Sequence, residues 1–222
     1  MDVWRRPYSF HADAPDGKSR IRNTTWHESL VDYTDGTETG AIRFERSLSA
    51  LGAPLGVAFD FDVKTHWQPV ESQRAQLWAS QRGLAETFMD QLGKRHFERA
   101  TSASDRATLL ECADAVGLSS AELDAFLDSD QLREEVWRSY GDTVRDMGIH
   151  SIPLFVFNLE ANGGPFREGV GATFTHGGSG SPEAFDELFE RAWAAAEDAT
   201  RTRGPTRQTH EEGGGFCGVP GT

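Results

Sequence analysis

The sequence predicts an α/β protein in which one long helical stretch interrupts the strands. Three observations support this class: an alternating aromatic segment near the start, helical periodicity from about residue 67 to 148, and two strand-like segments before a final helix. The chain has 222 residues with 6 Trp, 3 Tyr and 14 Phe, enough apolar surface for one sizeable core. A globular domain is therefore expected over residues 1–200.

Before residue 67 the pattern alternates between extended and helical segments. Trp4 to Phe10 is alternating and aromatic, as strands are, and the turn residues of 12–17 follow it. Trp26 to Tyr33 fits a short helix, and Thr39 to Leu51 fits a second, with Gly52 after its end. Val57, Phe59 and Phe61 recur at period two, which predicts an extended segment over Leu55–Phe61.

The next eighty residues are strongly helical. Pro69 suits a first helical turn, and Leu77, Leu84, Phe88 and Leu92 follow at spacings of seven, four and four. Another helix is predicted from Ser104 to Val116, with Gly117 as its C′ residue. These helices and the two that follow them, near Ser119 and Ser129, form a predicted all-helical insertion at about 67–148.

Serines mark the starts of the last two helices of this insertion. Ser119 and Glu122 have capping-box spacing, in which Ser accepts from the N3 amide and Glu reaches back. Ser129 is predicted to cap the following helix, which carries Leu132, Val136, Val144 and Met147 and ends at Gly148.

After Gly148 the pattern returns to strands. Ile152 to Phe157 has a buried-strand composition with Pro153 at its start, and Phe166 to Thr175 is a second, glycine-broken candidate. Ser181 and Pro182 then open a final helix as N-cap and N1. Its apolar stripe comprises Phe185, Leu188, Phe189, Ala192 and Trp193. Periodicity stops after Thr200, so residues 201–222 are expected to be a flexible tail.

Charge argues against several classes of partner. The net charge is −13, which repels nucleic-acid phosphates and anionic membrane surfaces. No run of about 18 apolar residues is present, and the first residues lack the apolar stretch of a signal peptide. The expectation is a soluble cytoplasmic or other intracellular protein that binds neither nucleic acid nor membrane.

The cysteines and histidines predict no redox pair, metal or cofactor. Cys112 and Cys217 form no Cys-x-x-Cys, so no catalytic residue is assigned. Cys112 lies on an apolar helix face, where Cys acts as a small hydrophobe, whereas Cys217 is either incidental or able to form a mixed disulfide. The seven histidines show no ligand spacing, so no zinc site is expected. The glycine-rich loop 176–181 either binds an anion at the helix start or merely connects two elements.

Several blocks resemble one family. Gly148 to Phe157 resembles the Gly-Val-x-x-Val-Pro-x-Phe-Val-Phe block of DsbA-like thioredoxin-fold oxidoreductases, in particular the relatives grouped with polyketide-associated disulfide isomerases. Trp4 to Phe10 resembles their second strand, Leu51 to Phe61 the segment before their helical insertion, and Arg74 to Gly148 the insertion itself. The resemblance implies a thioredoxin-like fold with a large helical insertion.

The resemblance also implies a binding site. In this family the proline of the strand block is cis, and the residue before it exposes its backbone to an extended substrate. Ile152 and Pro153 are therefore the expected substrate-binding residues, with an extended peptide or glutathione as the expected partner. We expect a cis bond between them.

This chain also departs from the family pattern. The family's first βα unit, a strand and a Cys-x-x-Cys helix, has no counterpart before Trp4, and only Arg74 matches the usual Asn-Thr-x-x-Ala-His-Arg motif. Without that strand, Trp4–Phe10 either pairs with the Pro153 strand or has its partner in a segment outside this sequence. Two functions follow: a thiol-disulfide oxidoreductase or isomerase family member that is inactive as given, or a redox-dead module that binds peptide or glutathione.

Overall fold

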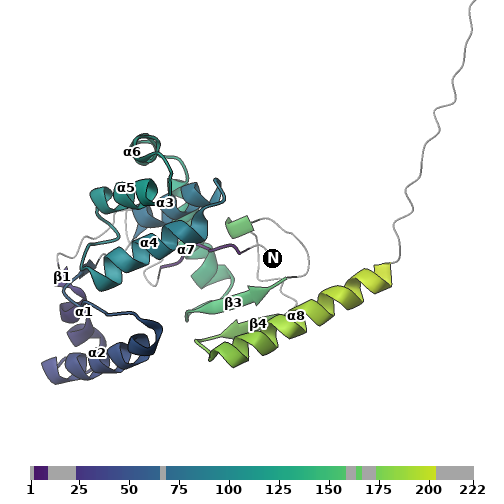
Figure 1. Ribbon diagram of the computed structural model, residues 1–222, viewed down its shortest axis with the longest axis horizontal. Helices are drawn as coiled ribbons and strands as arrows, with labels where there is room; N and C mark the ends of the chain where they lie inside the picture. The colour runs from purple at the N-terminus through teal and green to yellow at the C-terminus, as the bar shows by residue number, and fades with distance from the viewer. Residues whose placement is uncertain (1–2, 10–23, 66–68, 159–163, 167–173, 204–222) are drawn as a thin grey trace, which may run out of the picture. The chain divides into compact units, whose positions relative to one another are not determined.

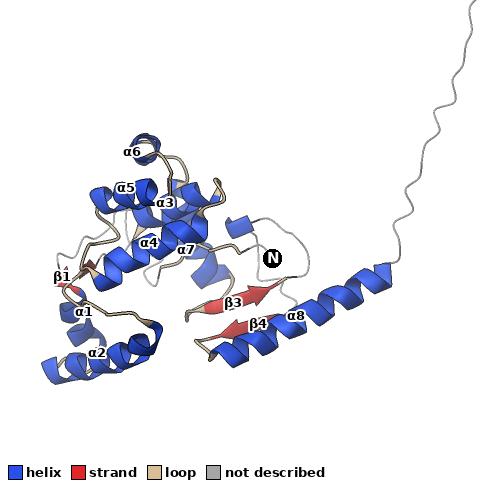
Figure 2. Ribbon diagram, viewed as in Figure 1, coloured by secondary structure: helices blue, strands red, loops and turns tan. Residues whose placement is uncertain are grey.

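The computed structural model describes residues 3–9, 24–65, 69–158, 164–166 and 174–203. These residues form two compact units, and Figures 1 and 2 show that helices dominate. The first unit comprises residues 1–150 and 162–170, and the second comprises residues 151–161 and 171–222. The chain is thus mostly helical with few strands, a refinement of the predicted α/β class.

The first unit is a set of helices with one two-residue bridge between strands. β1 and β2 pair antiparallel, with Thr24 opposite Thr65. The elements in chain order are β1 (Thr24–Thr25), α1 (Trp26–Tyr33), α2 (Glu38–Gly52), the 3-10 helix η2 (Ala53–Leu55), β2 (Lys64–Thr65), α3 (Val70–Ser80), α4 (Ala85–Glu98), α5 (Arg106–Ala115), α6 (Ser120–Asp128), α7 (Arg133–Gly141), the π-helix η3 (Asp142–Asp146) and the 3-10 helix η4 (Gly164–Phe166).

Local capping explains where several of these helices begin. Thr25 forms a full capping box with Glu28 at the start of α1, which confirms the helix predicted over Trp26–Tyr33. Thr37 caps α2 through the amide of Gly40. Ser119 accepts from the amide of Glu122, so the predicted cap of α6 is confirmed in its serine half.

Two helix boundaries differ from the sequence prediction. The periodic stretch from Pro69 to Leu92 is two helices, because Gly83 adopts a left-handed conformation with φ +73° between α3 and α4. Ser129 does not cap α7; its hydroxyl donates to the carbonyl of Phe126, and Leu132 stands at the helix start. The predicted helix around Leu109 and its C′ glycine, Gly117 with φ +78°, are confirmed.

Two apolar clusters hold the first unit together. The larger joins α3, α4, α5 and α6, with Phe88, Leu109, Cys112 and Leu123 fully buried at its centre. The smaller joins α3 and α7 through Val70, Leu77, Val136 and Tyr140. Burial of apolar side chains is the main favourable term in folding, so α3, which serves both clusters, is the central helix of the unit.

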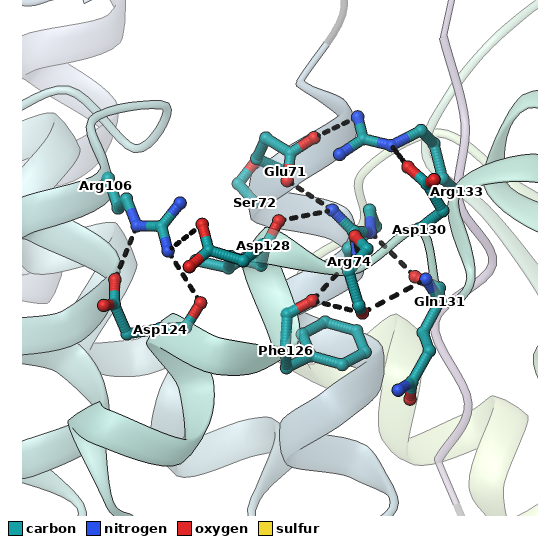
Figure 3. A network of polar contacts seen from close by, with 12 residues as sticks. Glu71, Ser72, Arg74, Arg106, Asp124, Phe126, Asp128, Asp130, Gln131 and Arg133 are labelled. Atoms are coloured by element: carbon teal, nitrogen blue, oxygen red, sulfur yellow. Dashed lines mark hydrogen bonds and ion pairs between the residues drawn. The ribbon is translucent and has the colours of Figure 1, made fainter.

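Arg74 is a fully buried cation within this helical unit. Its Nη2 donates to the carbonyl oxygens of Phe126 and Ser129 at 3.1 and 2.6 Å, and its Nε donates to that of Gln131 at 2.8 Å. Its Nη1 lies 2.6 Å from the carboxylate of Glu71 (Figure 3). The guanidinium thus satisfies carbonyls at the C-terminal end of α6, which the helix itself leaves unpaired.

Burial and charge act in opposite directions on Arg74. Desolvation lowers the pKa of its guanidinium, and the Glu71 carboxylate raises it. A guanidinium keeps its proton under such perturbation, so Arg74 remains charged in the interior. Glu71 is in turn held by Arg133 at 2.6 Å, which places the buried charge in a fully hydrogen-bonded network.

The predicted strand over Trp4–Phe10 does not form: residues 3–9 carry no strand pairing, and Phe10 lies outside the described residues. Side chains of the helices bind this segment instead. Ser139 donates to the carbonyl of Pro7 at 2.9 Å, and Gln73 donates to the carbonyl of Tyr8 at 2.9 Å. Buried backbone groups need partners, and here side-chain donors replace a neighbouring strand.

Charged side chains of the same segment also attach it to the helices. Arg5 makes a two-pronged contact with Glu86 of α4, at 2.9 and 2.6 Å, and Arg6 donates to the hydroxyl of Thr143 in η3 at 2.7 Å. Arg5 is half exposed, so its ion pair contributes little to stability. Segment 3–9 is therefore anchored mainly by the buried contacts of Pro7 and by those of Tyr8.

The segment predicted as extended over Leu55–Phe61 is likewise not a strand. Leu55 ends η2, and no ladder pairing is found among residues 57–61. Phe59 and Phe61 instead pack with Trp26 and Phe97, with ring centroids 4.8–6.0 Å apart. Period-two aromatic residues here serve an irregular cluster, which alternation alone does not distinguish from a strand.

The second unit is a hairpin with one helix along it (Figure 2). β3 (Leu154–Phe157) pairs antiparallel with β4 (Phe174–Gly177), and α8 (Pro182–Arg203) follows. The predicted strand after Pro153 and the final helix are confirmed. The predicted strand over Phe166–Thr175 is only partly tested, because residues 167–173 lie outside the described residues and β4 begins at Phe174.

Among the described helices, none combines the length and apolar character needed to cross a bilayer. α8 is the longest, and its sequence alternates apolar and charged residues.

Candidate functional site

The residues expected to bind substrate stand on the turn into β3. The peptide bond between Ile152 and Pro153 is cis, as predicted. The carbonyl of Pro153 accepts a hydrogen bond from the amide of Gly178 at 2.8 Å, and Leu154 pairs with Gly177. The end of the β3–β4 hairpin therefore holds Pro153 in place.

Ile152 is open to solvent on this turn. Half of its surface is exposed, at 50%, although isoleucine is usually a buried residue. Within the described part of the chain, neither its amide nor its carbonyl has a hydrogen-bond partner. A free backbone donor and acceptor beside an exposed apolar side chain suit an extended polypeptide, which offers the same groups in return.

Aromatic packing fixes the strand that follows. Phe155 and Phe157 lie on one face of β3 and contact Phe185 and Phe189 of α8, with centroids 4.8 and 6.1 Å apart. Val156 points to the opposite face and is 38% exposed. The helix thus covers one face of the hairpin, and the other face is partly open.

The glycine-rich stretch from His176 to Ser181 is better explained as a connection between β4 and α8 than as an anion-binding site. Ser181 uses its hydroxyl to accept from the amide of Ala184, and Glu183 occupies the first turn of α8. Hydrogen bonds from its own amide and from Ser181 lower the pKa of the Glu183 carboxyl. A carboxylate already occupies the positive end of this helix.

His176 is packed between rings in the same unit. Its ring lies 6.2 Å from Phe155 and 5.6 Å from Phe185, and its Nε2 is buried without a partner among the described residues. The side chain is only partly buried overall. Its place on β4 facing α8 indicates a packing role.

Cys112 lies in the larger core cluster and has no exposed surface, as predicted. Burial raises the pKa of its thiol, and Arg95 acts weakly in the opposite direction. A protonated, enclosed thiol is neither a nucleophile nor a metal ligand. Cys217 lies outside the described residues, and among those described no cluster of three or more His, Cys, Asp or Glu side chains could hold a metal.

Sequence reasoning missed the groups that hold segment 3–9. Gln73 on α3 is partly buried and Ser139 on α7 is buried, and their partners are 65 and 132 positions away. Arg74 was singled out only for its match to a motif. The available signal was its helical spacing from Val70 and Trp78, four positions away on either side, which puts the cation on an apolar helix face where it needs a buried partner.

The comparisons with known proteins agree with this arrangement. The model of the DSBA-like thioredoxin domain matches residues 40–173, more than half of the chain. The fold resembles the crystal structure of a probable DsbA oxidoreductase from Streptomyces coelicolor with a TM-score of 0.66. That match covers 85% of this chain and 74% of the other, at 20% identity, so it shows the fold alone. No curated protein matches the sequence.

Proposed function

Because the chain belongs to the DSBA-like thioredoxin domain family, we propose that it contributes the polypeptide-binding part of a thiol-disulfide oxidoreductase or isomerase and runs no dithiol–disulfide cycle with its own cysteines. Disulfide exchange needs an accessible thiolate. Cys112 offers none, since it is enclosed in the core, and no Cys-x-x-Cys is present in this sequence.

The observation that carries the binding role is the exposed Ile152 before a cis Pro153. An extended chain laid beside this turn would exchange backbone hydrogen bonds with Ile152 and would cover its side chain. The same feature supports the second candidate function, a redox-dead module that holds a peptide or glutathione. The two candidates differ in whether disulfide chemistry accompanies binding.

We expect that adding the purified chain will not accelerate the reduction of insulin by dithiothreitol. Cys112 should resist alkylation in the folded protein and react only after denaturation, because its thiol is buried and protonated. Mass spectrometry after iodoacetamide treatment, with and without urea, measures this. Catalysed insulin reduction would contradict the proposal, and assaying Cys112→Ala together with Cys217→Ala would show whether these cysteines caused it.

Binding is tested by calorimetry with an unfolded, carboxymethylated polypeptide and, separately, with glutathione. We expect the polypeptide to bind and Ile152→Asp to weaken its affinity about tenfold or more, equivalent to about 1.4 kcal/mol, because contact would bury a carboxylate. Leu55→Asp is the matched control, since Leu55 is also an exposed apolar residue, at 79%, and lies outside this turn.

Equal weakening by both substitutions would show that the chain binds apolar polypeptide nonspecifically. If neither ligand binds to the unmodified chain, the binding-module candidate is wrong.

A further inference from the structure

The ring of His27 on α1 lies between two carboxylates of α2. Its Nε2 is 3.0 Å from Glu38 Oε1, and its Nδ1 is 2.5 Å from Glu45 Oε1. Glu38 and Glu45 are seven residues apart, so both stand on the face of α2 that meets α1. Ionised carboxylates only accept hydrogen bonds, and a neutral imidazole has one N–H. Only the doubly protonated ring can donate to both.

The Glu45 side of this contact is the more shielded. The exposed fractions of the side chains are 18% for Glu45, 26% for His27 and 67% for Glu38. When the ring loses a proton, the remaining N–H can donate to only one of the two carboxylates, and the lone pair of the other nitrogen faces an oxygen of the second. Charge-assisted hydrogen bonds between α1 and α2 are thereby exchanged for a repulsive contact.

The surrounding charges leave these two carboxylates as the dominant influence. Hydrogen bonds that the ring donates to Glu45 first and to Glu38 second raise the pKa of His27, and burial acts in the opposite direction. The remaining charged groups on α1 and on the described elements packed against it are Glu28, Asp32, Arg43, Arg46 and Lys64. The segment before β2, which is hydrogen-bonded to α1, adds Asp60 and Asp62. Among the described residues, ion pairs to the His27 ring come only from Glu38 and Glu45.

Other attachments of α1 do not depend on pH. The amide of Trp26 donates to the carbonyl of Val63 at 2.7 Å, and that of His27 donates to the carbonyl of Phe61 at 2.9 Å. These bonds tie α1 to the segment before β2. The contacts of the His27 ring are therefore the attachment of α1 to α2 that changes as the imidazole titrates.

We infer that His27 is a pH-dependent clasp: its protonated ring holds α2 against α1, and the contact loosens when the ring loses its proton. The folded pKa is raised, so the stabilisation is complete below the ordinary histidine pKa and is lost as pH rises through the folded value. This device is independent of the binding role proposed above.

NMR titration of the His27 ring and hydrogen exchange of backbone amides test the clasp in the full chain. Protection of amides in α2, taken relative to amides in α5 at the same pH, should fall about threefold as His27 deprotonates, the scale of a partly exposed ion pair. In His27→Gln this ratio should be low at every pH and independent of pH.

Carboxylate variants separate the clasp from a general charge effect. Glu45→Gln should lower the His27 pKa more than Glu38→Gln does, and the surface control Asp90→Asn, which pairs with Lys94 on α4, should leave it unchanged. These titrations remain decisive if His27→Gln fails to fold. A His27 that titrates at its ordinary pKa, an exchange ratio constant with pH, or equal effects of all three carboxylate variants would overturn the inference.

Discussion

Replacing Arg74 with Met is expected to lower the free energy of unfolding by about 3–5 kcal/mol, the usual cost of removing one partner from a buried charged network. The substitution removes the Arg74 donors from the carbonyls of Ser129 and Gln131, while that of Phe126 keeps the amide and hydroxyl of Ser129. Met fills much of the same volume. Urea denaturation followed by circular dichroism measures the change.

Arg106→Met is the matched control because Arg106 binds the same helix, α6, from outside. It contacts the side chains of Asp124 and Asp128 at 2.6 and 2.8 Å while its own side chain is 44% exposed (Figure 3). Exposed ion pairs contribute at most about 1 kcal/mol, so this variant should remain close to the parent protein. If both variants lost the same unfolding free energy, the buried contacts of Arg74 would stabilise the protein no more than the exposed ones of Arg106 do.

Replacing Leu109 with Ala is expected to cost about 2–5 kcal/mol, because it opens a cavity at the centre of the larger core cluster. Leu109 has no exposed surface, and the cluster around it is formed by α3, α4, α5 and α6. Closely packed helices relax only partly into such a cavity. The same urea titration measures the loss.

Leu55→Ala makes the same chemical change at a residue that is 79% exposed. It should shift the unfolding free energy by no more than about 0.5 kcal/mol. If the two alanine variants were equally stable, Leu109 could not lie in a packed core, and the cluster described for the first unit would be wrong.

The variants also test whether binding depends on the helical unit. Ile152 belongs to the second compact unit, whereas Arg74 and Leu109 belong to the first. Peptide binding by Leu109→Ala at temperatures where its helical unit has unfolded would locate the binding determinants in the hairpin and its turn. This comparison uses the calorimetric assay for Ile152→Asp and needs no further reagent.

Features that depend on neighbours a few positions away could be predicted from the sequence alone. Ser119 with Glu122, and Ser181 with Pro182, mark helix starts correctly because a cap joins a side chain to an amide within the first turn. The apolar spacing around Leu109 located a buried helix face and with it Cys112. The cis bond at Pro153 was predicted by family resemblance, since local chemistry favours trans.

The arrangement of long-range partners, by contrast, depends on how the elements pack. Residues 3–9 alternate as a strand does, yet their carbonyls are bound by Gln73 and Ser139, and alternation says nothing about which donors are within reach. Arg74 and His27 are unremarkable in sequence, because their meaning comes from carbonyls and carboxylates that folding brings beside them. Local patterns encode which face of an element is buried; the identity of what lies against that face depends on how the elements pack.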